Sequence, residues 1–259
     1  MKLTKKDIAM YSLFFAAIAL FVFLFFMFFR SGDFQTSEHS VDIPREVTDV
    51  NITANYTNVN IYRSGSDKAY IHYGRRITSG SEDEISVAVL DNAMQMTIKR
   101  KQGNTLSGLW RSSAPVNVYL PDTNNITLKI KTDTGTITLD RAILHRLDLQ
   151  SQVSFLNINN GVLDRLNYKS KAGKLTADAA KISVADISVN VGIFDLLHQT
   201  ENDGFTLDST IGAGYIFSDN EMELAHPKLC LKYSDKISGL MGANKIVLNS
   251  NVALVRITK

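Results

Sequence analysis

The sequence predicts an all-β protein: a right-handed parallel β-solenoid with about 19 residues per coil, preceded by one N-terminal transmembrane α-helix. Three observations lead to this prediction. Residues 8–29 are continuously apolar, residues 45–123 contain short runs of alternating apolar and polar residues, and from residue 124 the alternation recurs in phase at a fixed spacing. A short fixed period of this kind is typical of a solenoid, in which each repeat forms one coil.

The apolar segment at residues 8–29 is long enough to cross a membrane. Its 22 residues carry no charge and include eight phenylalanines. At 1.5 Å per residue a helix of this length reaches about 33 Å, which exceeds a hydrocarbon core of about 30 Å. The alternative is a cleaved signal peptide, but that would need a shorter apolar run followed by small residues, and here the run ends in FMFFRSGD. We therefore expect a retained anchor that contacts membrane lipid.

Basic residues on the two sides of this segment predict its orientation. Lys2, Lys5 and Lys6 precede it, whereas Arg30 is the only basic residue between its end and Arg45. The positive-inside rule then makes residues 1–7 a cytoplasmic tail and places the rest of the chain outside the cell membrane. No second apolar run is long enough to span, so we expect a single-pass protein.

Charge and cysteine content restrict the class of protein further. Residues 31–259 hold 24 basic and 25 acidic residues, a balance that does not predict nucleic-acid binding. Cys230 is the only cysteine, so no intramolecular disulfide can form. An exported domain held by its core alone suits a bacterial envelope.

The segments between the anchor and the repeat read as a linker followed by hairpins. Residues 30–44 are polar and without periodicity, and we expect them to form a tether. Residues 45–123 contain runs rich in Val, Ile, Tyr and Thr, separated by turn residues. This region is expected to cap one end of a solenoid formed by residues 124–259, and residues 245–259 are expected to supply cap strands at the other end.

The repeat is defined by a corner position flanked by alternating apolar residues. Successive corners are predicted 19, 19, 19 and 20 residues apart, at Gly135, Ser154, Gly173, Gly192 and Gly212. Glycine suits a corner because a Cβ would clash there. A β-sandwich with evenly spaced turns is the alternative, but its hairpins usually recur every 8–12 residues. Crossovers between parallel strands favour the right-handed form of the solenoid.

The motifs VNVYLP (116–121) and TLKIKTDTGTITL (127–139), with the LDLQS, LNYKSKAG and ISVNVG coils that follow, resemble the bacterial putative-adhesin family. The resemblance covers about residues 45–255. It implies a β-solenoid ectodomain, membrane-anchored as in proteins of Gram-positive envelope-stress operons. The serine at position 154 and the sequence Gly212-Ala213-Gly214 depart from the repeat.

Residue patterns that support catalysis are missing from the sequence. The five histidines are scattered without an HxH or HExxH pair, and no GxSxG, P-loop or GxGxxG motif occurs. The outward positions of the first limb mix both signs of charge: Lys129/Lys131, Asp148/Gln150, Asn167/Lys169, Asp186/Ser188 and Thr206/Asp208. We expect no enzyme activity, no metal and no cofactor, and interpret this face as a solvated surface.

Two loops and one basic cluster are candidate contact sites. Leu109 and Trp110 lie in one glycine-containing loop, and Leu240 and Met241 lie in another. Exposed apolar side chains on loops can contact a partner, although each loop could equally fold back as a cap. The cluster Arg75/Arg76 with Lys99/Arg100/Lys101 could bind an anionic wall polymer or lipid head groups.

These features predict a non-enzymatic cell-envelope protein that acts as an adhesion, scaffold or envelope-stress module through its solenoid. The alternative is an accessory subunit of a membrane protein complex, bound through the transmembrane helix and the solenoid. An envelope protein or an anionic wall polymer is the expected partner.

Overall fold

The computed structural model describes residues 35–78, 81–99, 114–122, 125–197, 205–218, 233–238 and 244–257. The predicted membrane span at residues 8–29 lies outside these ranges, as do Leu109, Trp110, Cys230, Leu240 and Met241. No helix among the described residues is long and apolar enough to cross a membrane. Every regular element in the described ranges is a β-strand, which confirms the all-β class.

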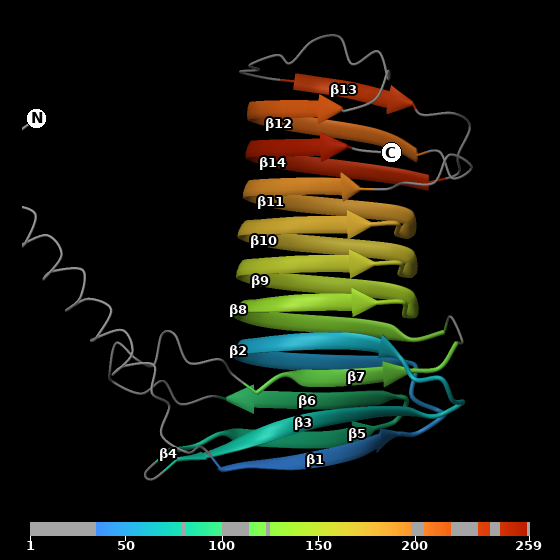
Figure 1. Ribbon diagram of the computed structural model, residues 1–259, viewed down its shortest axis with the longest axis vertical. Helices are drawn as coiled ribbons and strands as arrows, with labels where there is room; N and C mark the ends of the chain where they lie inside the picture. The colour runs from blue at the N-terminus through green and yellow to red at the C-terminus, as the bar shows by residue number, and fades with distance from the viewer. Residues whose placement is uncertain are drawn as a thin grey trace, which may run out of the picture. The chain divides into compact units, whose positions relative to one another are not determined.

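Four long strands form the regular centre of the fold, stacked one above the other in Figure 1. They are β8 (Thr127–Asp140), β9 (Ile143–Asn159), β10 (Val162–Asp178) and β11 (Lys181–Leu197). Each pairs with the next in parallel, so that Leu144 lies beside Leu163 and Leu163 beside Ile182. The shift between these paired strands is 19 residues, the period predicted from the sequence.

Each long strand bends at a corner into two limbs, and the core lies between the two sheets that these limbs form (Figure 1). Alternation turns every second side chain inward, and the register then stacks equivalent side chains from coil to coil. The buried first-limb residues include Leu128/Ile130, Leu147/Leu149, Leu166/Tyr168 and Ala185/Ile187. The buried second-limb residues include Ile137/Leu139, Leu156/Ile158, Leu175/Ala177 and Phe194/Leu196.

The predicted corner residues Gly135, Ser154, Gly173 and Gly192 pair in a single column. In β8 and β10, a buried hydroxyl three residues before the corner donates a hydrogen bond to a backbone carbonyl where the strand bends. Thr132 Oγ1 donates to the carbonyl of Thr134 at 3.1 Å, and Ser170 Oγ donates to that of Ala172 at 2.7 Å. A buried carbonyl without a donor is costly, which explains the small polar residue at this point of the repeat.

Tyr168 shows why glycine occupies the corner of β10. Its buried phenol extends along the core to the corner of β9, where its hydroxyl lies 3.0 Å from Ser154 Oγ and donates to the Ser154 carbonyl at 3.1 Å. A Cβ on Gly173 would overlap that hydroxyl. The corner glycine therefore provides space for a neighbouring side chain.

The opposite ends of the coils close through tight turns that the sequence pattern did not reveal. Arg141, Asn160 and Ala179 lie there at 19-residue intervals, each in the left-handed region with φ of 52°, 51° and 47°. The amide of each donates to the last strand residue of the following coil, for example Arg141 to Asn159 at 2.9 Å. These three residues therefore adopt the left-handed conformation that the turns require, whereas the corner glycines have negative φ.

The N-terminal end differs from the prediction, because the solenoid already begins before residue 124. The strand β2 (Asp49–Arg63) pairs in parallel with both limbs of β8 and is a full coil. Below it, β6 (Ala93–Lys99) pairs with its first limb and β7 (Val116–Leu120) with its second. Together β6 and β7 form one interrupted coil.

Antiparallel strands cover this end of the stack (Figure 1). They are β3 (Ala69–Thr78) on β7, β5 (Glu84–Leu90) on β6, and the short β4 (Ser81–Glu82) on β3. The strand β1 (Gln35–Ile43) lies next to β3 at the edge. The predicted tether 30–44 is therefore wrong over residues 35–43, which form this strand.

The C-terminal end corrects the predicted order of coils. The last strand, β14 (Asn244–Ile257), inserts in parallel between β11 and β12 (Phe205–Ser218), and β13 (Tyr233–Ser238) pairs antiparallel with β12. Residues 245–257 are thus an inner coil, and β13 is the cap. Gly192 pairs with Ala253, which pairs with Gly214. The predicted corner Gly212 is wrong by two residues, because β12 stacks on β14 and not on β11, so that the 19-residue spacing does not continue from Gly192.

The hydroxyl of Tyr168 should make folding sensitive to alkaline pH. Burial raises the pKa of this phenol above its ordinary value of 10.0, partly offset by hydrogen bonds from Ser154 and Ser170. The folded state therefore keeps the proton while the unfolded chain loses it, so stability falls as pH rises from 10 towards the folded pKa. Unfolding by urea at pH 8 to 11 should show this loss.

The variant Tyr168→Phe is the control for this prediction. It should cost about 1–2 kcal/mol at pH 8, because Ser154 loses a buried hydrogen-bond partner. It should also flatten the part of the pH dependence that belongs to Tyr168. An unchanged alkaline slope in the variant would contradict the assignment.

Candidate functional site

A shallow groove of about 630 Å³ runs across the outer face of the first-limb sheet. It crosses β2, β8, β9, β10 and β11. Two neighbouring columns of outward side chains line it, Asn51/Lys129/Asp148/Asn167/Asp186 and Thr53/Lys131/Gln150/Lys169. At about 4.8 Å per strand the groove extends for roughly 19 Å along the stack.

These side chains line the groove because they alternate with the core. Lys129 and Lys131 flank the buried Ile130, and Gln150 follows the buried Leu149. The parallel register then repeats each outward position on the next coil. The result is a linear array of hydrogen-bonding and charged groups at strand spacing.

Most charges in the first column are paired. Asp148 accepts hydrogen bonds from Arg146 Nε at 2.8 Å and from Asn167 Nδ2 at 2.5 Å. Lys129 lies 2.6 Å from Asp49, and Arg165 lies 3.6 Å from Asp186. These pairs are at least partly exposed, so each contributes little to stability and can exchange partners with a ligand.

The second column carries unpaired positive charge. Within the described ranges, neither Lys131 nor Lys169 has an ion-pair partner, and both side chains are exposed. Gln150 lies between them in the register. Two ladder steps separate the lysines by about 10 Å. The groove can therefore bind an extended ligand that carries repeated anionic groups and hydroxyls.

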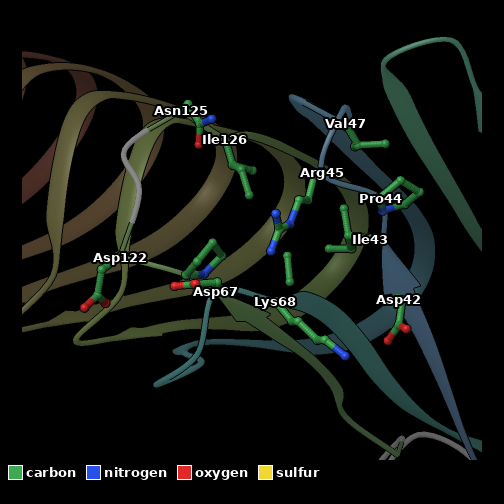
Figure 2. A pocket seen from close by; sticks show the side chains of 12 residues that line it. Asp42, Ile43, Pro44, Arg45, Val47, Asp67, Lys68, Asp122, Asn125 and Ile126 are labelled. Carbon is green, nitrogen blue, oxygen red and sulfur yellow. The ribbon is translucent and has the colours of Figure 1, made fainter.

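A second cavity, of about 550 Å³, lies at the N-terminal end of the stack on the side of the tight turns (Figure 2). Its apolar lining includes the buried residues Ile43, Val47 and Ile126. Charged side chains of both signs surround it: Asp42, Arg45, Asp67, Lys68 and Asp122. Asp122 is paired with Arg63. Carboxylates outnumber cations around this cavity, which makes it less suited to an anion than the groove.

A strip of tyrosines lies on the second-limb face of β2, β7 and β3. Tyr70 stacks on Tyr119 with ring centroids 4.5 Å apart, and Tyr62 lies 5.4 Å from Tyr119. Desolvation raises the pKa of Tyr119. Asn60 donates to Asn117 at 2.9 Å in the next outward column. Such aromatic rings present a flat apolar surface with polar edges.

Two histidines of the described ranges lie in pairs with carboxylates near the surface. His145 lies 3.0 Å from Asp164, and His72 lies 3.6 Å from Glu38. In this part of the chain no three His, Cys, Asp or Glu side chains are grouped so as to hold a metal ion. The buried Asp195 is neutralised from both sides, by Lys174 at 2.9 Å and Arg256 at 3.1 Å.

Of the contact residues predicted from the sequence, only Arg75, Arg76 and Lys99 lie in the described ranges. Leu109, Trp110, Leu240 and Met241 lie outside those ranges. In the predicted basic cluster, Lys99 lies 3.5 Å from Glu84 on the hairpin partner strand. The groove residues of the two columns on β8 to β11 were predicted from the sequence as outward positions, whereas Asn51 and Thr53 on β2 were not. The signal in the sequence was the recurrence of hydrogen-bonding residues at the same two outward positions of each coil. The hollow that joins the two columns results from three-dimensional packing.

The chain is similar to one protein family and to several solved structures. The family model Toastrack DUF4097 matches residues 25–220. Among solved structures, a putative cell adhesion protein from Clostridium sporogenes is 17% identical with a TM-score of 0.48, and covers 86% of this chain and 99% of its own. A putative adhesin from Bacteroides fragilis is 13% identical with a TM-score of 0.46, covering 88% and 98%. The search of curated proteins finds no match. The chain belongs to the Toastrack DUF4097 family.

Proposed function

We propose that the protein is a non-enzymatic, adhesion-type protein of the bacterial cell envelope, anchored by residues 8–29, which binds an anionic envelope polymer in the first-limb groove. The observation that carries the proposal is the pair of unpaired ammonium groups, Lys131 and Lys169, on either side of Gln150 in a groove that crosses five coils. A polymer with repeated phosphate or carboxylate groups matches this linear array in charge and in length.

The solenoid architecture supports a binding role of this kind. The same outward positions recur on each coil, so that a polymer can lie along the stack and contact several coils at once. Each contact is weak because the side chains are exposed, but contacts repeated along one chain add by avidity. The position outside the membrane would give the groove access to wall polymers. A role in the envelope-stress response would follow if occupancy of the groove were signalled across the anchor.

Removal of the two lysine charges should abolish most of this binding. We expect Lys131→Gln/Lys169→Gln to weaken binding of a glycerol-phosphate polymer to the full-length protein at least about tenfold, in line with about 0.7 kcal/mol or more per charge. Binding to the unchanged protein should weaken as salt rises, because salt screens exposed charges. Fluorescence anisotropy of labelled polymer measures both effects.

The matched control is Arg141→Gln/Lys171→Gln. It removes the same net charge from exposed positions outside the groove, one in the turn between β8 and β9 and one on β10. Equal loss of affinity in the two double variants would show that only total charge matters and would overturn the groove as the site. Affinity unchanged by the groove variant would overturn it as well.

A further inference from the structure

A strip of exposed apolar side chains runs along the corners of the coils. Its members are Val153 and Phe155 on β9, Val191 and Ile193 on β11, and Val252 and Leu254 on β14, with exposed fractions between 37% and 54%. They flank the buried corner residues on either side. We call these six residues the corner ridge.

The register makes the corner ridge continuous. Val153 pairs with Ala172, which pairs with Val191, which pairs with Val252. In the second column Phe155, Lys174, Ile193 and Leu254 follow one another in the same way. Lys174 directs its amine to Asp195, 2.9 Å away, so that its charge is neutralised at the side of the ridge. Among the described residues, six of the nine exposed large apolar side chains belong to this strip, and such concentration on one strip marks a contact surface.

The charges beside the corner ridge favour contact with a partner surface that is negative or neutral. On the first-limb side the next positions are Gln152, Lys171, Asn190 and Asn251, which are neutral apart from the exposed Lys171. On the second-limb side Asp195 is buried and paired with Lys174 and Arg256. In these two flanking columns of the four ridge coils, no carboxylate is left unpaired.

The corner ridge is too small for a stable dimer and lies on the side where the chain enters the fold. Six partly exposed side chains offer a few hundred Å², below the roughly 800 Å² that each partner buries in a standard interface.

Glu38 lies beside His72, and Asp42 and Ile43 line a cavity with Ala69, so β1 runs antiparallel to β3. Because β3 runs from the turn side towards the corners, β1 begins at the corner side.

Only five residues, 30–34, separate the end of the apolar segment 8–29 from β1. Extended, they and their two connecting bonds reach about 20 Å at most. If residues 8–29 span the membrane, the start of β1, on the corner side of the N-terminal end of the stack, therefore lies within about 20 Å of the bilayer. We propose that the corner ridge rests on the lipid surface and lays the solenoid along the membrane, with its six side chains at the level of the head groups.

This inference relies on the anchoring part of the proposed function. Apolar side chains with a neighbouring lysine are the pattern by which proteins insert shallowly into an anionic interface. The axis of the stack would then run along the membrane. The first-limb groove would follow the same direction beside it.

The test uses the full-length protein in nanodiscs of phosphatidylcholine and phosphatidylglycerol that hold one copy each. An environment-sensitive dye is placed at Val191→Cys, or at Ser188→Cys on the same coil, in a Cys230→Ser background. We expect the dye at 191 to shift to the blue, to be quenched by nitroxide lipids and to be shielded from aqueous iodide. The dye at 188 should show the opposite behaviour. Equal behaviour at the two positions would overturn the proposal.

A variant pair tests whether the ridge itself makes the contact. Phe155→Ser/Ile193→Ser should remove lipid quenching of a dye at Val252→Cys, whereas Val89→Ser/Leu90→Ser, at exposed apolar positions of β5, should leave it unchanged. Shielding that appears only when two copies share a disc would assign the ridge to a second copy instead. If the protein failed to copurify with nanodiscs, the anchor itself would be overturned. An anchored protein whose corner ridge stays exposed to water would overturn only the ridge proposal.

Discussion

Truncation of the chain after residue 243 should abolish the folded state or leave β11 as the last ordered coil. The removed strand β14 contributes Ile246, Leu248, Val255 and Ile257 to the core, all at most 7% exposed. Burial of each such side chain is worth about 1.5–3 kcal/mol, so the four together approach the total stability of a typical domain. The loss also separates β12 and β13 from the stack, because β14 is the strand that joins β12 to β11.

Hydrogen exchange of the amides in β12 measures this effect directly, and two single substitutions provide a milder version. Val255→Asp places a charge at a position with 0% exposure, whereas Leu254→Asp changes its neighbour, which is 37% exposed. We expect the first to unfold β14 and β12 and the second to preserve the fold. Protection of β12 that survives the truncation would mean that β12 pairs with β11 directly, against the observed order.

Gly135→Ala should destabilise the protein by about 3 kcal/mol, at the upper end of the usual cost of overpacking. The added Cβ would overlap the carbonyl oxygen of Thr57 on the neighbouring coil. A backbone atom cannot rotate away as a side chain can, so that β2 and β8 must separate locally. Urea unfolding monitored by circular dichroism gives the change in the free energy of unfolding.

The control for this substitution is Gly65→Ala. Gly65 has a φ of 63°, but a Cβ there would have nothing within 4 Å. It should cost only about 1–2 kcal/mol, the penalty for an alanine in the left-handed region. If Gly65→Ala proved the more damaging of the two, the corner would not depend on space at position 135.

A repeat encodes some features of this fold locally and leaves others without a local signal. The spacing of Gly135, Ser154, Gly173 and Gly192 is encoded locally, because each coil repeats the same alternation and the register follows from stacking like on like. The position of β14 is not encoded in this way. Its corner residue is Ala253 and not glycine. No local signal in the sequence indicates that β14 stacks on β11 in place of β12, which precedes β14 in the chain.

The N-terminal end escaped prediction for the same reason. The coil made by β6 and β7 is divided by residues 100–115, so its two halves read as separate short strands. The left-handed turns at Arg141, Asn160 and Ala179 have no common residue type that would mark them. The site was foreseen only in part. Lys131 and Lys169 were recognisable as outward positions, but their lack of carboxylate partners depends on which side chains Asp148 and Asp186 engage.

Site-specific titration of the groove is the most direct test of the account. A dye is attached at Gln150→Cys, or at Asn157→Cys on the second-limb face of the same strand, in full-length protein carrying Cys230→Ser. With increasing glycerol-phosphate polymer, we expect a saturable change in the signal at 150 that is lost at high salt, and no change at 157. Polymer binding that leaves the signal at 150 unchanged, or that changes the signal at 157 instead, would contradict the proposal that the first-limb groove is the binding site.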